Sequence, residues 1–217
     1  MVGYVSEEQQ VEAIKKWWKE NGKAVIAGIV LGLVILFGGR AWIEYRQEQA
    51  EEASAQYAEL MAAKEQGNAA LAVQKGEAVL KEYASTPYGA LAALALAQIE
   101  LERGDVAAAR THLQWAMDNA RQEGVRHVAR LRLGRVLIAE GNWDAALALV
   151  PASGTEGFTA AYEELKGDAY VAKGDVGQAR EAYRKALEAL GPTAPNRALL
   201  QMKLDDLGEA NQQEQVS

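Results

Sequence analysis

The longest apolar stretch of the chain lies near its amino terminus, where residues 24–39 include no charged side chain. As a helix this stretch rises about 24 Å, less than the roughly 30 Å of a bilayer core. An extension to Ile43 reaches about 30 Å, provided that the Arg40 side chain snorkels to the interface. Tryptophans flank the stretch as in an interfacial aromatic belt, at Trp17, Trp18 and Trp42. The pattern predicts a transmembrane helix over residues 24–43.

Two other interpretations of this stretch stay open at the level of sequence. A core helix of a soluble domain would rarely be apolar on every face. A cleaved signal peptide begins with a short basic region, whereas 23 residues precede this stretch. Gly39 and Ala41 have the spacing of a cleavage site, but Arg40 stands between them.

Basic residues on the two sides of the stretch predict its orientation. Four lysines precede it, and only Arg40 and Arg46 follow it over a comparable length. Positively charged flanks tend to stay in the cytoplasm. We therefore expect residues 1–23 to be cytoplasmic and residues 44–217 to face the periplasm or an equivalent exterior.

Residues 6–20 have a helical pattern of their own. Ser6 and Gln9 show capping-box spacing, and Asn21-Gly22 is expected to end the helix. Apolar residues recur on one side, at Val11, Ile14, Trp17 and Trp18. The segment is either an amphipathic anchor lying on headgroups or a partner, or a solvated lead-in to the span.

Small residues recur every four positions within the predicted span, at Ala24, Gly28 and Gly32. Such spacing lets a second membrane helix approach closely. The alternative is that it reflects the ordinary frequency of glycine in membrane helices.

A glycine followed by Asp or Asn recurs through the rest of the chain, at Gly67-Asn68, Gly104-Asp105, Gly141-Asn142 and Gly174-Asp175. A glycine of positive φ followed by a capping Asp or Asn is typical of the turn in a helical hairpin. Small residues stand at fixed offsets on both sides of these turns, at Ala72, Ala109, Ala146, Ala179, Ala97, Gly134 and Gly167. Close helix crossings are expected at these positions.

This period near 34 residues resembles the tetratricopeptide repeat. We predict an all-α fold: a single N-terminal transmembrane helix, then a tetratricopeptide-like α-solenoid of about four helical hairpins plus a C-terminal capping helix. The third hairpin should be short, because Pro151 and the loop to Gly157 cut its second helix. The capping helix is expected over residues 196–207, within a periplasmic domain over residues 44–208, and residues 209–217 are expected to form a disordered tail.

In tetratricopeptide folds the first helix of each hairpin lines a concave groove. The register of the glycines assigns eight residues to this groove: Leu91, Leu94, Gln98, Leu101, Val128, Leu131, Arg135 and Ile138. So apolar a surface suits an extended or helical hydrophobic segment of a partner. The alternative is that these residues are core side chains covered by neighbouring helices.

Arginines cluster on the second of these groove helices, with Arg126, Arg130 and Arg132 forming a basic patch next to Arg135. The surrounding chain is acidic, with 18 basic and 26 acidic residues after residue 43 and a formal net charge of −7 overall. The patch suits an acidic partner or lipid headgroups, or else it pairs with neighbouring carboxylates on a solvated face. The acidic balance argues against a general nucleic-acid binder.

Catalytic and metal-binding chemistry has little support in this sequence. The chain has no cysteine, which excludes thiol catalysis, and its two histidines, His112 and His127, fall in different predicted helices without an evident nucleophile. The glycines recur as turns and form no phosphate-binding loop. We expect a chain that is not an enzyme and needs no cofactor or metal, with carboxylate chemistry as the enzymatic alternative.

Several segments, in their order along the chain, resemble the YfgM family of ancillary subunits of the SecYEG translocon. They are residues 10–15 and 20–23 before the span, and residues 88–92, 131–133, 173–175 and 200–203 after it. The repeat segments are generic, whereas the amino-terminal block joined to a single span is more specific to the family.

The resemblance implies an inner-membrane protein with a cytoplasmic amino terminus and a periplasmic repeat domain. Family members associate with SecYEG and with the membrane-anchored periplasmic chaperone PpiD, and assist newly exported polypeptides; a role in envelope stress has also been attached to them. The leading hypothesis is a membrane-tethered interaction module at the export channel. The alternative is a structural scaffold for envelope assembly or stress signalling that oligomerises through its repeats.

Overall fold

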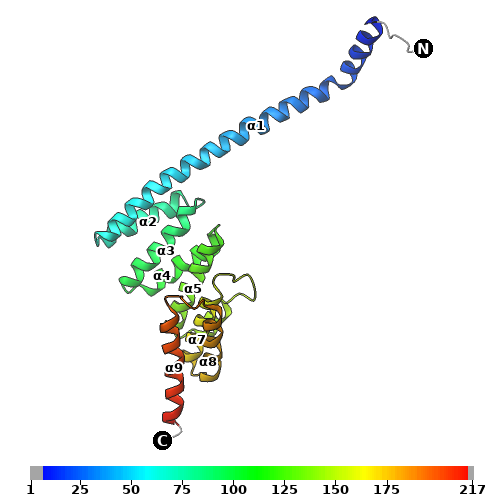
Figure 1. The fold of residues 1–217 in the computed structure, drawn as a ribbon. Coiled ribbons are helices and arrows are strands. Elements are labelled where there is room, and N and C mark those ends of the chain that lie inside the picture. Colours follow the sequence, from blue (N-terminus) through cyan, green and yellow to red (C-terminus); the bar gives the residue numbers. More distant parts are fainter. Residues whose placement is uncertain (1–6, 215–217) are drawn as a thin grey trace, which may run out of the picture. The chain divides into compact units, whose positions relative to one another are not determined.

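The computed structural model describes residues 7–214, and within this range the chain forms nine α-helices and no strand (Figure 1). The helices are α1 (Glu7–Glu65), α2 (Ala69–Glu82), α3 (Pro87–Glu102), α4 (Val106–Asn119), α5 (Glu123–Ala139), α6 (Trp143–Ala148), α7 (Thr159–Lys173), α8 (Val176–Ala189) and α9 (Arg197–Glu214). The chain divides into two compact units, Met1–Glu51 and Glu52–Ser217. The all-α fold expected from the sequence is confirmed.

The described part of the first unit is a single stretch of α1. This helix is long and apolar enough to cross a membrane, and none of its most apolar 18-residue stretch is buried. Large apolar side chains stay exposed along it, including Ile26, Leu31, Phe37 and Ile43. The stretch is therefore not a core helix of the described fold.

α1 continues through Asn21 and Gly22 without a break, which corrects the expectation of a separate helix ending there. The Asn21 side chain donates a hydrogen bond of 3.1 Å to the carbonyl oxygen of Trp17, inside the helix. One glycine costs a helix only about 1 kcal/mol, and the helix formers on both sides outweigh this cost. Ser6, the expected cap, lies outside the described residues.

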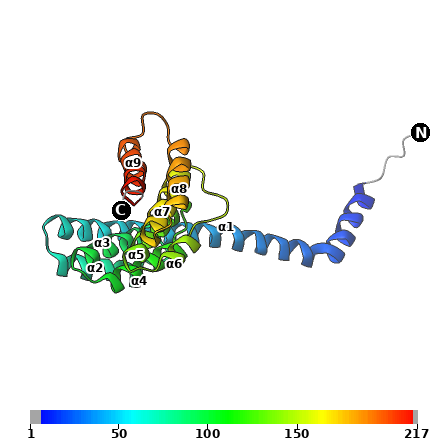
Figure 2. The same cartoon turned by 90° about the horizontal axis from the view of Figure 1, so that it is seen from below.

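The second unit is a stack of helical hairpins. The last turns of α1 pack on α2 and α3 in one buried cluster, and α3 pairs with α4, α5 with α6 and α7 with α8. α9 packs on α8 (Figure 2). Each hairpin contacts chiefly its neighbours in the chain, as in a solenoid.

The four turn glycines adopt the expected left-handed backbone, with φ between 72° and 83°: Gly67, Gly104, Gly141 and Gly174. Asn68, Asp105 and Asp175 each cap the following helix by accepting a hydrogen bond of 2.9–3.1 Å from the backbone N–H three residues later. Asn142 makes no such bond, and its amide donates to Glu140 instead. The predicted caps are thus present in three turns.

Small residues stand where helices cross most closely, as their spacing indicated. A Cβ atom on Gly167 would lie 2.2 Å from the Tyr183 ring, and one on Gly134 would lie 2.6 Å from Leu165. The alanines that follow the turn glycines are fully buried, at Ala72, Ala109, Ala146 and Ala179. Side chains at these crossings are therefore limited in size by the neighbouring helix.

Among the described residues, four buried clusters form the core, each shared by neighbouring helices. Leu60 and Val79 belong to the cluster of α1–α3, and Leu113 and Leu133 to that of α3–α5. Tyr162 lies between α5 and α7. Tyr183 packs with α9 residues, including Leu200 and Leu207.

Two helices differ from regular repeats. α6 has six residues, whereas α2, α4 and α8 have 14 each, which confirms the shortened third hairpin. α9 continues to Glu214, which corrects the expected disorder of residues 209–214; residues 215–217 lie outside the described range.

Polar contacts hold α9 in place. The Lys203 ammonium donates to Glu164 at 2.7 Å and to Asp168 at 2.8 Å. Burial acts to lower the pKa of Lys203, but the hydrogen bonds and charges of these carboxylates outweigh it and the net pKa is raised. Asp168 also accepts a 2.7 Å hydrogen bond from the Tyr183 hydroxyl, whose pKa is raised by burial and by that bond.

Candidate binding site

A cavity of about 490 Å³ opens between α3, α4 and α5; we call it the inner cavity. It is lined by Ala97, Gln98, Leu101, Val106, Leu113, Arg132, Arg135, Val136 and Ala139. Its floor is apolar, because Ala97, Leu113 and Val136 belong to the buried cluster of α3–α5. Leu101, 42% exposed, and Val106, 36% exposed, add uncovered apolar surface beside this floor.

The predicted groove residues fall into three groups. Gln98, Leu101 and Arg135 line the inner cavity. Leu94 and Leu131 are core side chains, with 8% and 6% of their surface exposed. The remaining residues are half-buried, at Leu91, Val128 and Ile138. The structure therefore brings together the carboxyl-terminal parts of the two predicted groove helices and buries much of the rest.

The arginines of α5 do not form one patch. Arg132 and Arg135 line the inner cavity, whereas Arg126 and Arg130 line a second cavity, of about 330 Å³, beside the loop at Pro151. Within residues 7–214, neither Arg132 nor Arg135 makes a hydrogen bond or an ion pair with another described side chain. The two exposed guanidinium groups of the inner cavity are thus unpaired.

The second cavity is built around His127, which is buried in the core between α5 and α7. The Nδ1 atom of His127 lies 2.7 Å from the Tyr162 hydroxyl, and its ring stacks on Phe158 at a centroid distance of 4.7 Å. Burial raises the pKa of Tyr162, and Arg130 opposes this effect. These contacts account for His127 as a structural residue.

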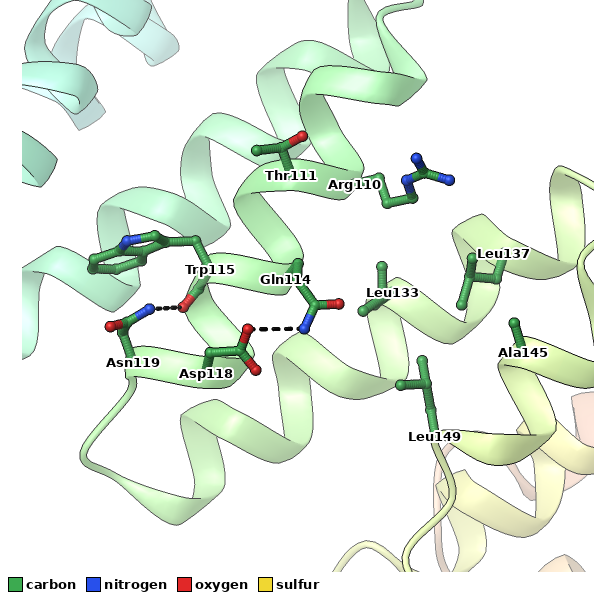
Figure 3. A pocket seen from close by; sticks show the side chains of 10 residues that line it. All are labelled: Arg110, Thr111, Gln114, Trp115, Asp118, Asn119, Leu133, Leu137, Ala145 and Leu149. Carbon is green, nitrogen blue, oxygen red and sulfur yellow. Dashed lines mark hydrogen bonds between the residues drawn. The ribbon is translucent and has the colours of Figure 1, made fainter.

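A third cavity, of about 620 Å³, is lined by side chains of α4, α5 and α6 and by Leu149 (Figure 3). We call it the outer cavity. Leu133, Leu137, Ala145 and Leu149 supply its apolar wall. α6 has only six residues and is too short to cover the α4 side chains that line this cavity. The groove register considered only the first helix of each hairpin and therefore did not predict the outer cavity. The sequence feature that could have indicated this cavity is Pro151, which shortens the third hairpin.

Polar side chains of the outer cavity are satisfied within the domain. Arg110 donates to Glu140 at 3.3 Å, and Gln114 donates to Asp118 at 2.9 Å. Thr111 and Asn119 donate to backbone carbonyls of their own helix. Both charged side chains that line the outer cavity, Arg110 and Asp118, therefore have a hydrogen-bond partner, in contrast to Arg132 and Arg135 of the inner cavity.

One edge of the inner cavity is set by a chain of hydrogen bonds. Lys64 of α1 donates to Gln98 at 2.7 Å, and Gln98 donates to Glu102 at 2.9 Å. Nearby, buried Glu100 accepts from Arg103 at 3.0 Å. The carboxylates on the α3 side thus have partners of their own and leave the α5 arginines free.

The small residues of the predicted span are exposed in this structure. Ala24 is exposed, and a Cβ atom on Gly28 or Gly32 would meet no other atom within 4 Å. This face of α1 could accept another helix, and its proposed packing role stays a prediction.

Metal chemistry finds no support in the residues described. Among them, no group of three or more His, Asp or Glu residues is arranged to hold a metal ion. His112 is half-buried on α4, and burial lowers its pKa against the opposing charges of Glu100 and Glu77.

The sequence matches the tetratricopeptide repeat-like domain family over residues 15–209. This range includes most of α1 as well as the helical stack. The match confirms the repeat interpretation of the glycine spacing.

Three relatives are each named "Ancillary SecYEG translocon subunit". The chain is 33% identical to the protein of Escherichia coli (strain K12) over 204 residues, which cover 94% of this chain and 98% of the relative. It is 32% identical to that of Haemophilus influenzae, with 94% and 98% covered. Identity to the Neisseria gonorrhoeae protein is 31%, with 95% and 100% covered.

Proposed function

The chain belongs to the tetratricopeptide repeat-like family of ancillary SecYEG translocon subunits, and we propose that it acts as a membrane-tethered interaction module at the export channel. The observation that carries this proposal is similarity over 94% of the chain, spanning both the apolar helix and the repeats. The unburied apolar stretch of α1 supports its role as the anchor. Tethering raises the concentration of the repeat domain near the channel.

We further propose that the amino-terminal segment is cytoplasmic and the repeat domain periplasmic. The four lysines before the span support this orientation. In the periplasm the domain would link the channel to the chaperone PpiD and receive newly exported polypeptides. The inner cavity, apolar and uncovered, supports a binding role for this face.

The tethering role is tested by co-purification of SecYEG with the tagged full chain from detergent-solubilised membranes. A chain lacking residues 1–43 should recover much less translocon. A third form, with an unrelated transmembrane helix in place of residues 24–43, separates tethering from a specific helix contact. Equal recovery with all three forms would contradict the proposal.

The orientation is tested with single cysteines, for which the cysteine-free chain is a clean background. Glu12 and Ala55 are exposed on α1 on opposite sides of the predicted span. In spheroplasts, a membrane-impermeant maleimide should label Ala55→Cys at once and Glu12→Cys only after lysis. The reverse pattern would place the repeats in the cytoplasm and remove the proposed role.

The binding face is tested by site-specific crosslinking in cells. A photoreactive residue at Leu101 or Arg135 should capture PpiD or an exported polypeptide, because both positions line the inner cavity. Arg184, exposed on α8, is the matched control position. Capture from Arg184 alone would move the binding face away from the inner cavity.

A further inference from the structure

The inner cavity combines apolar surface with two unpaired positive charges. Arg132 and Arg135 stand three residues apart on α5, and side chains at this spacing share one face of a helix. Both line the cavity together with exposed Leu101 and Val106. This combination distinguishes the inner cavity from the outer one, where Arg110 is paired with Glu140.

Arg132 and Arg135 stay unpaired among the described residues although the surrounding chain is acidic. After residue 43 acidic residues outnumber basic ones by 26 to 18, so carboxylate partners are abundant. The carboxylates on the α3 side nevertheless have other partners, since Glu100 accepts from Arg103 and Glu102 from Gln98. α5 itself carries four arginines and one carboxylate, Glu123. The inner cavity is therefore a basic, apolar site within an acidic domain.

We propose that the inner cavity binds a polypeptide segment that presents apolar side chains together with a carboxylate, which pairs with Arg132 and Arg135. This inference rests on the proposed function for the idea that the domain binds polypeptides, and it adds the chemistry of the bound segment. A guanidinium group pairs well with a carboxylate through charge-assisted hydrogen bonds. The apolar side chains cover Leu101 and Val106, and the carboxylate supplies the selectivity.

A polypeptide fits this site better than a phosphate-bearing ligand. A phosphate needs positive charge, but it makes no use of an apolar floor formed by Ala97, Leu113 and Val136. The cavity volume of about 490 Å³ suits a few side chains of a peptide. The bound segment therefore contacts both the apolar and the charged part of the site.

The test measures binding of labelled peptides to the full chain in nanodiscs of zwitterionic lipid, by fluorescence anisotropy, with empty nanodiscs as the blank. The probe is a short peptide in which leucine alternates with aspartate. Two matched peptides have asparagine or lysine in place of every aspartate. The aspartate peptide should bind about tenfold more tightly than the asparagine peptide, and the lysine peptide should bind most weakly.

The double variant Arg132→Gln/Arg135→Gln should bind the aspartate and asparagine peptides equally. Arg184→Gln, on exposed α8, is the matched control and should keep the tenfold preference. Arg132→Lys/Arg135→Lys keeps both charges and should keep part of the preference. A preference that is kept in the lysine variant and lost in the glutamine variant would come from the charges and not from a folding defect. Circular dichroism checks that all variants retain their helix content.

Equal binding of the aspartate and asparagine peptides to the unaltered chain would overturn the inference, as would a preference that survives Arg132→Gln/Arg135→Gln. Displacement of the peptide by vesicles of anionic lipid would overturn it in favour of a lipid site, and a concentration-dependent dimer that blocks binding would favour a second copy as occupant. Translocon co-purification is measured in parallel on the unaltered chain. If that chain recovers the translocon but shows no peptide selectivity, this inference fails alone; if it shows selectivity but recovers no translocon, the proposed function fails.

Discussion

Residues at helix crossings show how directly single positions of the sequence determine the solenoid. The offsets from the turn glycines correctly identified Gly134 and Gly167 as close contacts. They did not identify Gly76, where a Cβ atom would lie 2.6 Å from Leu96, because this glycine stands at an offset that the other hairpins do not share. Spacing therefore predicts a crossing only where the repeat is regular.

Gly167→Ala should destabilise the repeat domain by about 1–3 kcal/mol, because the new methyl group would overlap the buried Tyr183 ring at 2.2 Å. Urea unfolding of the full chain in detergent, followed by circular dichroism, measures the shift in midpoint. Gly177→Ala on α8 is the matched control, since its Cβ atom would meet only Asp175 at 3.7 Å. Equal midpoints for the two variants would refute the crowding at the crossing.

Protonation of His112 should weaken the fold at mildly acidic pH. Burial lowers its pKa below the ordinary value of 6.5, so the folded state favours the neutral ring. The unfolded state binds the proton more tightly, and stability is therefore full above about pH 6.5 and falls as pH drops through that value toward the folded pKa. Unfolding midpoints between about pH 5.5 and 7.5 should show this loss, and His112→Gln should reduce it. The same slope in both proteins would exclude His112 as its source.

Whole elements depend on their ends as well as on their apolar faces. Glycine turns and capping residues predicted the boundaries of the hairpins, and Pro151 predicted the short α6. The sequence did not predict that α1 would run through Gly22 or that α9 would reach Glu214. Both errors arose because weak helix-stop signals were given more weight than the helix formers around them.

The capping residues of two equivalent turns should differ in their contribution to stability. Asp105→Ala should cost about 1 kcal/mol, because Asp105 accepts a 2.9 Å hydrogen bond from the Ala108 N–H. Asn142→Ala should cost a few tenths at most, because the Asn142 side chain caps no backbone N–H of α6. Chemical unfolding of both variants side by side measures the difference. A larger loss for Asn142→Ala would reverse this assignment.

At the scale of the whole molecule, the order of anchor, repeats and final helix was predictable because each part has a local signature. The positions of the cavities were not. Leu94 and Leu101 share the same predicted groove register, yet Leu94 is buried and Leu101 is exposed. Which of them is covered depends on the size and position of the neighbouring helices, and no local pattern encodes that. The unpaired state of Arg132 and Arg135 likewise emerges only once the partners of every nearby carboxylate are known.

A solenoid needs a covered end, and α9 covers the last hairpin here. A chain ending at Pro195 should lose several kcal/mol of stability, since it removes the buried side chains of Leu200 and Leu207, each contributing about 1.5–3 kcal/mol, and uncovers Tyr183. It also removes Lys203, which leaves Asp168 without its ammonium partner. A chain ending at Gly208 keeps these contacts and is the control.

Limited proteolysis of both truncated chains should cleave α7 and α8 rapidly only in the shorter chain, because an uncovered last hairpin opens more often than the interior ones. Equal protection of the two chains would show that the hairpin of α7 and α8 is stable without its cap.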